Sequence, residues 1–117
     1  MKKTRTLLSI AMVLIFSVAN AQTYTANTGT SVLKWKGEKV TGEHFGTIGL
    51  KSGAFTLKDN KITEATFVVD MASIVCDDIE NEQYNAKLVG HLKSDDFFGT
   101  ATHPTASFTL KKAKELK

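Results

Sequence analysis

Apolar and polar side chains alternate along most of this sequence, and this period of two is the feature that most constrains its fold. In "SVLKWKG", Leu33 and Trp35 fall on one face while Lys34 and Lys36 fall on the other, which is typical of a half-buried strand. The alternation recurs at Ile48 with Leu50, Phe55 with Leu57, Phe67 with Val69 and Met71, and Ala106 with Phe108 and Leu110. The pattern therefore predicts strands rather than amphipathic helices.

The connections between these segments favour an antiparallel arrangement. Asp59 and Asn60 in "KDNK" tolerate the positive φ angles of a tight turn, so we expect a hairpin there. Glycines at positions 37, 42, 46, 49 and 53 indicate bulges and bends, by which a sheet curls into a barrel. An open sheet with one apolar face is the alternative, and either arrangement is all-β and antiparallel.

The acidic segment "CDDIENEQYNAKLVGHL" interrupts the alternation. Its apolar residues are spaced to line one face of a short helix, with Asp77 or Asp78 as the N-cap and first-turn acid. We therefore predict a short helical connection around residues 77–93, which links two strands and is not a domain boundary.

The N-terminus has the three-part layout of a secretory signal peptide. Basic residues come first, an apolar run from Leu7 to Val18 follows, and Ala19 and Ala21 flank the expected cleavage site after Ala21. The run is shorter than the ~20 apolar residues of a membrane span, although an uncleaved anchor is the alternative. The sequence predicts a signal peptide at 1–21, one domain at 22–117, a periplasmic or secreted location, and no membrane span after cleavage.

The charge of the chain gives no reason to expect a nucleic-acid partner. The formal net charge is +3, and Lys2, Lys3 and Arg5 of the predicted signal peptide account for all of it. The remaining chain is neutral by count, with lysines clustered only in the tail "KKAKELK".

The single cysteine, Cys76, excludes a disulfide within the chain. In an oxidising compartment an unpaired thiol is either buried and inert or able to link two chains. Burial is favoured because Cys76 follows the apolar pair Ile74 and Val75, and a disulfide-linked homodimer is the alternative.

No motif in the sequence predicts catalysis or metal binding. His44, His91 and His103 are far apart, and none forms a pair at metal-ligand spacing. Ser94 and Asp95 follow His91 too closely along the chain to form a triad with it. We expect no catalytic residue, no metal site and no cofactor; a metal-dependent enzyme using His44, His91 and the acidic pairs is the less favoured alternative.

The aromatic residues are numerous for so small a domain: Phe45, Phe55, Phe67, Phe97, Phe98, Phe108 and Trp35. In a curled sheet they either pack into a solid core or line a cavity that holds an apolar ligand. Sequence does not distinguish these two arrangements.

Two segments resemble the YceI-like polyisoprenoid-binding proteins: "MASIVCDD", continued by "YNAKLVGHLKSDDFFGTATHPTASFTL", and the upstream "LKWKGEKVTGEHFGTIGLKSGAF". The positions that carry the resemblance are Ser73, Ile74, His91, Leu92, Ser94, Asp96, Phe97, Phe98, Pro104, Ala106 and Phe108. Members of this family continue beyond the strand that contains Phe108. The resemblance therefore implies an elongated, lipocalin-like antiparallel β-barrel that is incomplete in this chain.

The resemblance also implies a function, the binding of a long isoprenoid lipid for sequestration or transport. Asp95 and Asp96 would turn and cap their segment, while Phe97 and Phe98 would point into the barrel. Alternation and proximity to the family motifs select the expected lipid-binding residues Leu33, Trp35, Phe55, Leu57, Phe67, Val69, Phe97 and Phe108. A secreted structural or stress-response domain with a solid core is the alternative.

Overall fold

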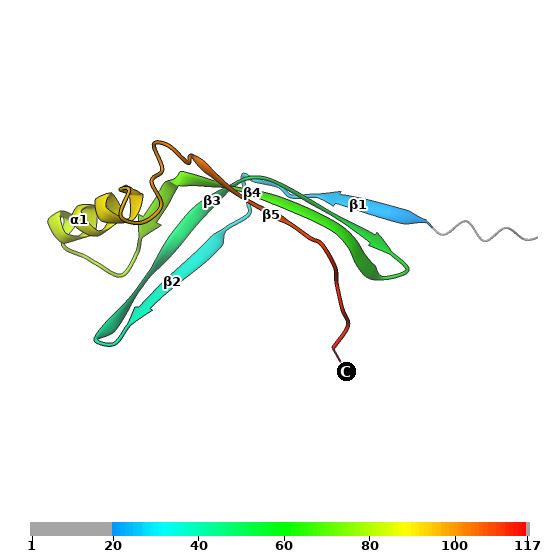
Figure 1. Cartoon of the computed structure of the whole chain (residues 1–117), viewed down its shortest axis with the longest axis horizontal. Helices are drawn as coiled ribbons and strands as arrows, with labels where there is room; N and C mark the ends of the chain where they lie inside the picture. Colours follow the sequence, from blue (N-terminus) through cyan, green and yellow to red (C-terminus); the bar gives the residue numbers. More distant parts are fainter. Residues whose placement is uncertain (1–19, 117) are drawn as a thin grey trace, which may run out of the picture.

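The computed structural model describes residues 20–116, which form one antiparallel sheet and one helix (Figure 1). In chain order the elements are β1 (Ala21–Thr25), β2 (Leu33–Lys39), β3 (Gly42–Lys58), β4 (Lys61–Cys76), α1 (Glu82–Lys93) and β5 (Thr105–Thr109). The predicted all-β class is confirmed. The predicted signal peptide lies almost entirely outside the described residues and stays a prediction.

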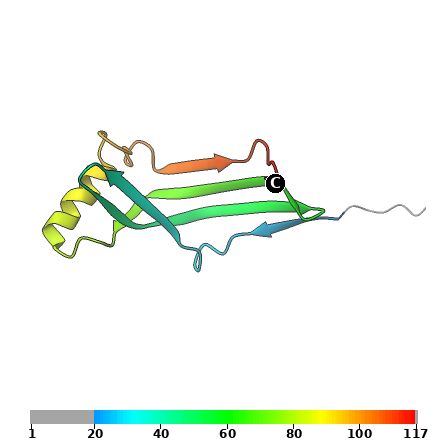
Figure 2. The same ribbon diagram turned by 90° about the horizontal axis from the view of Figure 1, so that it is seen from below.

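The long strands β3 and β4 form the centre of the sheet, and the shorter strands line its two edges. β1 pairs with residues 54–58 of β3 and β2 pairs with residues 42–48, so both lie along the same edge of β3. β5 pairs with residues 66–70 of β4. Figure 2 shows β5 along the opposite edge of the sheet from β1 and β2.

The predicted hairpin joins β3 to β4. Asp59 and Asn60 have φ angles of 52° and 60°, and the flanking residues Lys58 and Lys61 pair with each other. Asp and Asn adopt positive φ at lower cost than most residues, which explains why a two-residue turn closes here.

Three register shifts interrupt the pairing of β3 with β4. They lie between Thr47 and Gly49, between Leu50 and Ser52, and between Thr56 and Leu57. Each shift leaves more residues unpaired on one strand than on the other, which bends the sheet locally. The bulges expected from the scattered glycines are thus present, and the long strands curve along their length (Figure 1).

The predicted helical connection is confirmed, but it begins later than expected. Asn81 is the N-cap of α1, and its side-chain oxygen accepts a hydrogen bond from the backbone N–H of Tyr84 at 3.0 Å. The expectation that Asp77 or Asp78 caps the helix was wrong, because the carboxylate of Asp78 is bonded to residues on β3 and β4 instead.

The sheet formed by residues 21–109 is not closed into a barrel, as the sequence predicts. Within residues 20–116 the buried hydrophobic residues are Leu50, Ile74 and Cys76, and no side chain there is less than 2% exposed. The same part of the chain contains no helix long and apolar enough to cross a membrane. Within these residues no second layer covers the sheet, because α1 contacts only β4 among the strands.

Candidate functional site

Alternation and register place most of the apolar side chains of the strands on one face of the sheet, called here the apolar face. The cross-strand pairs on this face include Tyr24 with Phe55, Leu33 with Ile48, Leu50 with Val69, and Phe67 with Phe108. The opposite face is mainly polar; on it the hydroxyls of Thr23 and Thr56 lie 3.0 Å apart.

All the expected lipid-binding residues except Phe97 lie on the apolar face: Leu33, Trp35, Phe55, Leu57, Phe67, Val69 and Phe108. Their common placement is a structural result, whereas their contact with a ligand stays a prediction. Because they come from four different strands, the face is a continuous surface rather than a local patch.

Aromatic rings contact one another across this face and remain partly open to solvent. Tyr24 stacks on Phe55 with ring centroids 5.2 Å apart, and Phe67 lies 6.4 Å from Phe108 in a tilted arrangement. Tyr24 is 44% exposed and Phe108 is 54% exposed. The rings are thus oriented by their neighbours but keep area that a ligand can cover.

Two glycines of β3 give the aromatic residues room to lie flat across the strand. A Cβ atom at Gly53 would stand 2.5 Å from the ring of Phe67, and one at Gly46 would stand 2.9 Å from Nε1 of Trp35. The Trp35 indole N–H donates a hydrogen bond of 2.9 Å to the carbonyl oxygen of Val75. Trp35 therefore satisfies its polar atom within the protein and presents an apolar ring to the face.

Phe97 is not on the sheet. It lies in the turn between α1 and β5, 57% exposed, with its ring edge-to-face against His91 at 4.8 Å. Ser94 is the C-cap of α1, and a carboxylate oxygen of Asp96 lies 3.1 Å from Nε2 of His91. These residues therefore lie at the end of α1 and in the turn that follows it, and Phe97 does not lie beside the strand residues of the apolar face.

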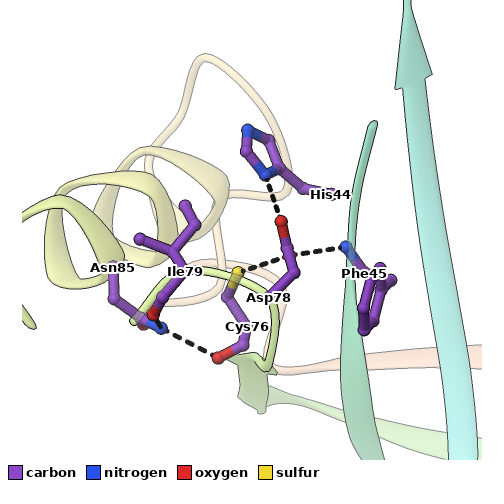
Figure 3. A network of polar contacts seen from close by, with 6 residues as sticks. All are labelled: His44, Phe45, Cys76, Asp78, Ile79 and Asn85. Carbon is purple, nitrogen blue, oxygen red and sulfur yellow. Dashed lines mark hydrogen bonds and ion pairs between the residues drawn. The ribbon is translucent and has the colours of Figure 1, made fainter. Parts of the chain in front are cut away.

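A polar network lies where β4 leads into α1, and Asp78 is at its centre (Figure 3). One carboxylate oxygen of Asp78 accepts from the backbone N–H of Phe45 at 2.9 Å and from the Cys76 thiol at 3.1 Å. The other lies 2.7 Å from Nδ1 of His44, which acts as the donor because an ionised carboxylate only accepts. These bonds, that of His44 first and that of Phe45 second, lower the pKa of Asp78 well below its ordinary range.

The same network fixes Cys76 and the start of the helix. Cys76 is buried, which agrees with the favoured prediction, and burial together with the bond to Asp78 raises the pKa of its thiol. The side-chain amide of Asn85 on α1 donates to the carbonyl oxygens of Cys76 and Ile79 at 2.9 and 3.0 Å. This role of Asn85 could not be predicted from the sequence, because no local motif around Asn85 indicates that its side chain bonds to backbone carbonyl oxygens.

The arrangement of the described ionisable groups favours a structural role for this network. The Cys76 thiol is directed at a carboxylate rather than at the imidazole of His44, so the pair lacks the contact that activates a nucleophile. His91 is bonded to a different carboxylate, that of Asp96. Among residues 20–116, no three His, Cys, Asp or Glu side chains converge as metal ligands.

The chain matches a known protein family over most of its length. The model of a family described as the YceI-like domain matches residues 24–117, which is most of the chain. No curated protein and no solved structure matches the sequence.

Proposed function

Because the chain belongs to the YceI-like domain family, whose members are known for binding polyisoprenoids, we propose that it binds a long isoprenoid lipid on its apolar face. The lipid would be a polyprenyl or isoprenoid-quinone-like chain. The observation that carries this proposal is the uncovered face on which four strands place aromatic and aliphatic side chains.

The physical chemistry of this face suits a ligand without hydrogen-bonding groups along its length. Burial of apolar surface contributes about 25 cal/mol per Å², or ~0.8 kcal/mol per methylene group. Half-exposed rings such as Phe108 would lose their remaining contact with water when a prenyl chain lies across them. Affinity then depends on contact area, and no catalytic residue is needed.

The proposal includes a location and a role. A signal peptide at residues 1–21 would deliver the protein to the periplasm or the medium, where a bound isoprenoid is sequestered or transported between membranes. A lipid so apolar is nearly insoluble in water, so a carrier that shields it makes either role feasible.

Lipid retention by matched variants tests the proposal. The purified protein is incubated with a long-chain polyprenol or isoprenoid quinone, separated from free lipid, and extracted for mass spectrometry. Phe67→Asp places a charge on the apolar face, whereas Val68→Asp places the same charge on the neighbouring residue of β4, which faces the other way.

We expect Val68→Asp to retain lipid and Phe67→Asp to lose at least about tenfold in retention. Retention by folded Phe67→Asp at the level of the unsubstituted protein would show that the apolar face is not the site. A folded, unsubstituted protein that takes up neither lipid would favour the structural domain without a ligand.

A further inference from the structure

We propose that Nε2 of His44 accepts a hydrogen bond from the terminal hydroxyl of a polyprenol whose chain lies along the apolar face. This inference rests on the proposed function and adds two things to it, the class of the head group and the direction in which the lipid lies. It makes His44 a binding residue in addition to its part in the network around Asp78.

The pairing of β2 with β3 places His44 at one end of the apolar face. Trp35 pairs with Gly46, and Leu33 pairs with Ile48. Alternate residues of a strand point to the same side, so positions 44, 46 and 48 of β3 all face the side on which Trp35 and Leu33 lie. A Cβ atom at Gly46 would stand against the Trp35 indole, in agreement with this orientation. His44 therefore lies about 7 Å along β3 beyond the position under the Trp35 ring.

The network around Asp78 holds the His44 ring so that one of its nitrogens stays available. Nδ1 lies 2.7 Å from the Asp78 carboxylate and donates to it. In a neutral imidazole the other nitrogen, Nε2, then carries a lone pair and no proton, so it accepts. Within residues 20–116 no group forms a hydrogen bond with Nε2, and Figure 3 shows this nitrogen on the side of the ring away from Asp78. The side chain is 37% exposed, so a ligand can reach it.

An acceptor at this position selects a head group that donates. The hydroxyl of a polyprenol is such a donor, whereas the carbonyl oxygens of an isoprenoid quinone only accept. A phosphate head group is disfavoured, because the ionised carboxylate of Asp78 lies against the same ring. Lys39 alternates onto the same side as His44, but it is exposed and lies at the turn between β2 and β3. Polyprenyl phosphate is therefore the competing ligand in the experiment.

The opposite end of the apolar face suits the hydrocarbon tail. Phe55 lies about 35 Å from His44 along the extended strand β3, and its ring stacks on that of Tyr24. The Tyr24 hydroxyl is a polar group at this end, but its proton is already donated to the side chain of Gln22 at 2.7 Å. We therefore expect the lipid hydroxyl at His44 and the chain directed toward Phe55.

Competition between two lipids that differ only in the donor tests this contact. The full chain is incubated at about pH 8.5, where an unperturbed imidazole is neutral, with equal amounts of a long-chain polyprenol and its methyl ether. Bound lipid is then extracted and quantified by mass spectrometry. A parallel competition sets the polyprenol against polyprenyl phosphate.

His44→Asn is the informative variant. The asparagine amide can occupy the position of Nδ1 and still donate to Asp78, but it leaves no acceptor at the position of Nε2. His91→Asn is the matched control, because His91 is also bonded to an aspartate, Asp96, and lies on α1 rather than on the sheet.

We expect the unsubstituted protein and His91→Asn to retain the polyprenol about fivefold more than the ether, which is the effect of one ordinary hydrogen bond. His44→Asn should bring this ratio to about one and leave retention of the ether unchanged. Tyr24→Phe should keep the preference. In the unsubstituted protein the ¹⁵N resonance of His44 Nε2 should shift on addition of the polyprenol and stay in place with the ether.

The inference is overturned by equal retention of polyprenol and ether in the unsubstituted protein, by an unchanged preference in folded His44→Asn, or by stronger retention of polyprenyl phosphate than of polyprenol. Loss of the preference in Tyr24→Phe would put the head group at the other end and overturn it equally. If His44→Asn fails to fold, the competition and the ¹⁵N resonance of the unsubstituted protein decide. Retention of both lipids without preference rejects this inference alone, whereas retention of neither rejects the proposed function as well.

Discussion

Nδ1 of His44 lies 2.7 Å from Oδ2 of Asp78, although 34 positions separate the two residues in the sequence. His44 is on β3, and Asp78 is in the segment that leads from β4 to α1. The same carboxylate accepts the backbone N–H of Phe45. Asp78 therefore ties the end of β4 to β3 at the point where the chain leaves the sheet to form the helix.

Replacement of the Asp78 carboxylate should destabilise the contact between β3 and the end of β4. In Asp78→Ala the backbone N–H of Phe45, the His44 ring and the Cys76 thiol all lose their acceptor, so we expect the Tm to fall by several degrees. Asp77→Asn is the control, because the Asp77 side chain makes no hydrogen bond to any of residues 20–116. Equal Tm values for the two variants in thermal unfolding would contradict the anchoring role.

Stability should depend on pH through Asp78. Its pKa is lowered in the folded state, so its contribution is fully present above the ordinary Asp pKa of about 4 and is lost as pH falls below that value. Tm measured from pH 7 to pH 3 should decline on the acid side. Asp78→Asn cannot titrate, and its decline over the same range should be shallower; parallel curves for the two proteins would contradict this assignment.

Local sequence signals account for the parts of the structure that were predicted. The side chains of a strand alternate whatever partner it has, so the sequence around Trp35, Phe55 and Phe67 is sufficient to predict an apolar face. The turn at Asp59 and Asn60 depends on the φ preferences of those two residues.

The features that were missed depend on contacts between distant parts of the chain. The position of Asp78 beside His44 depends on the register shift between Thr47 and Gly49 in the pairing of β3 with β4. The glycines predicted bulges in these strands, but not how many residues of β4 each bulge would leave unpaired. Asp78 resembles an N-cap in sequence, yet its carboxylate is bonded to other strands, and Asn81 caps the helix instead. Likewise, Phe97 follows no alternation that would indicate its position in a turn.

The close approach of Phe67 to Gly53 predicts a specific effect of adding one methyl group. In Gly53→Ala the new Cβ would collide with the Phe67 ring and press on Ala26, so the ring must move. We expect a loss of about 1–3 kcal/mol in the free energy of unfolding, measured by urea denaturation, together with weaker lipid retention.

Gly90→Ala provides the matched control for this methyl group. Gly90 lies within α1 and has open space around it, so alanine there should stabilise the helix by up to about 1 kcal/mol. If Gly53→Ala were as stable as Gly90→Ala, the requirement for glycine beneath the Phe67 ring would be wrong.

Trp35 provides a direct signal from the apolar face, because it is the only tryptophan of the sequence. Its ring lies on that face while its N–H is bonded to Val75, so a lipid across the face should make its surroundings less polar. Titration with a polyprenol should shift its fluorescence emission to shorter wavelength by several nanometres, and Phe67→Asp should abolish the shift.

Trp35→Phe tests whether lipid binding persists when the tryptophan fluorescence signal is removed. It removes the fluorescence and the bond to Val75, at a cost of about 1 kcal/mol in stability, but keeps an aromatic ring on the face. Lipid retention measured by extraction should therefore stay within about threefold of the unsubstituted protein, since most of the buried apolar area is unchanged. If extraction finds bound lipid in the unsubstituted protein while its Trp35 emission stays constant, the lipid lies elsewhere than on the apolar face.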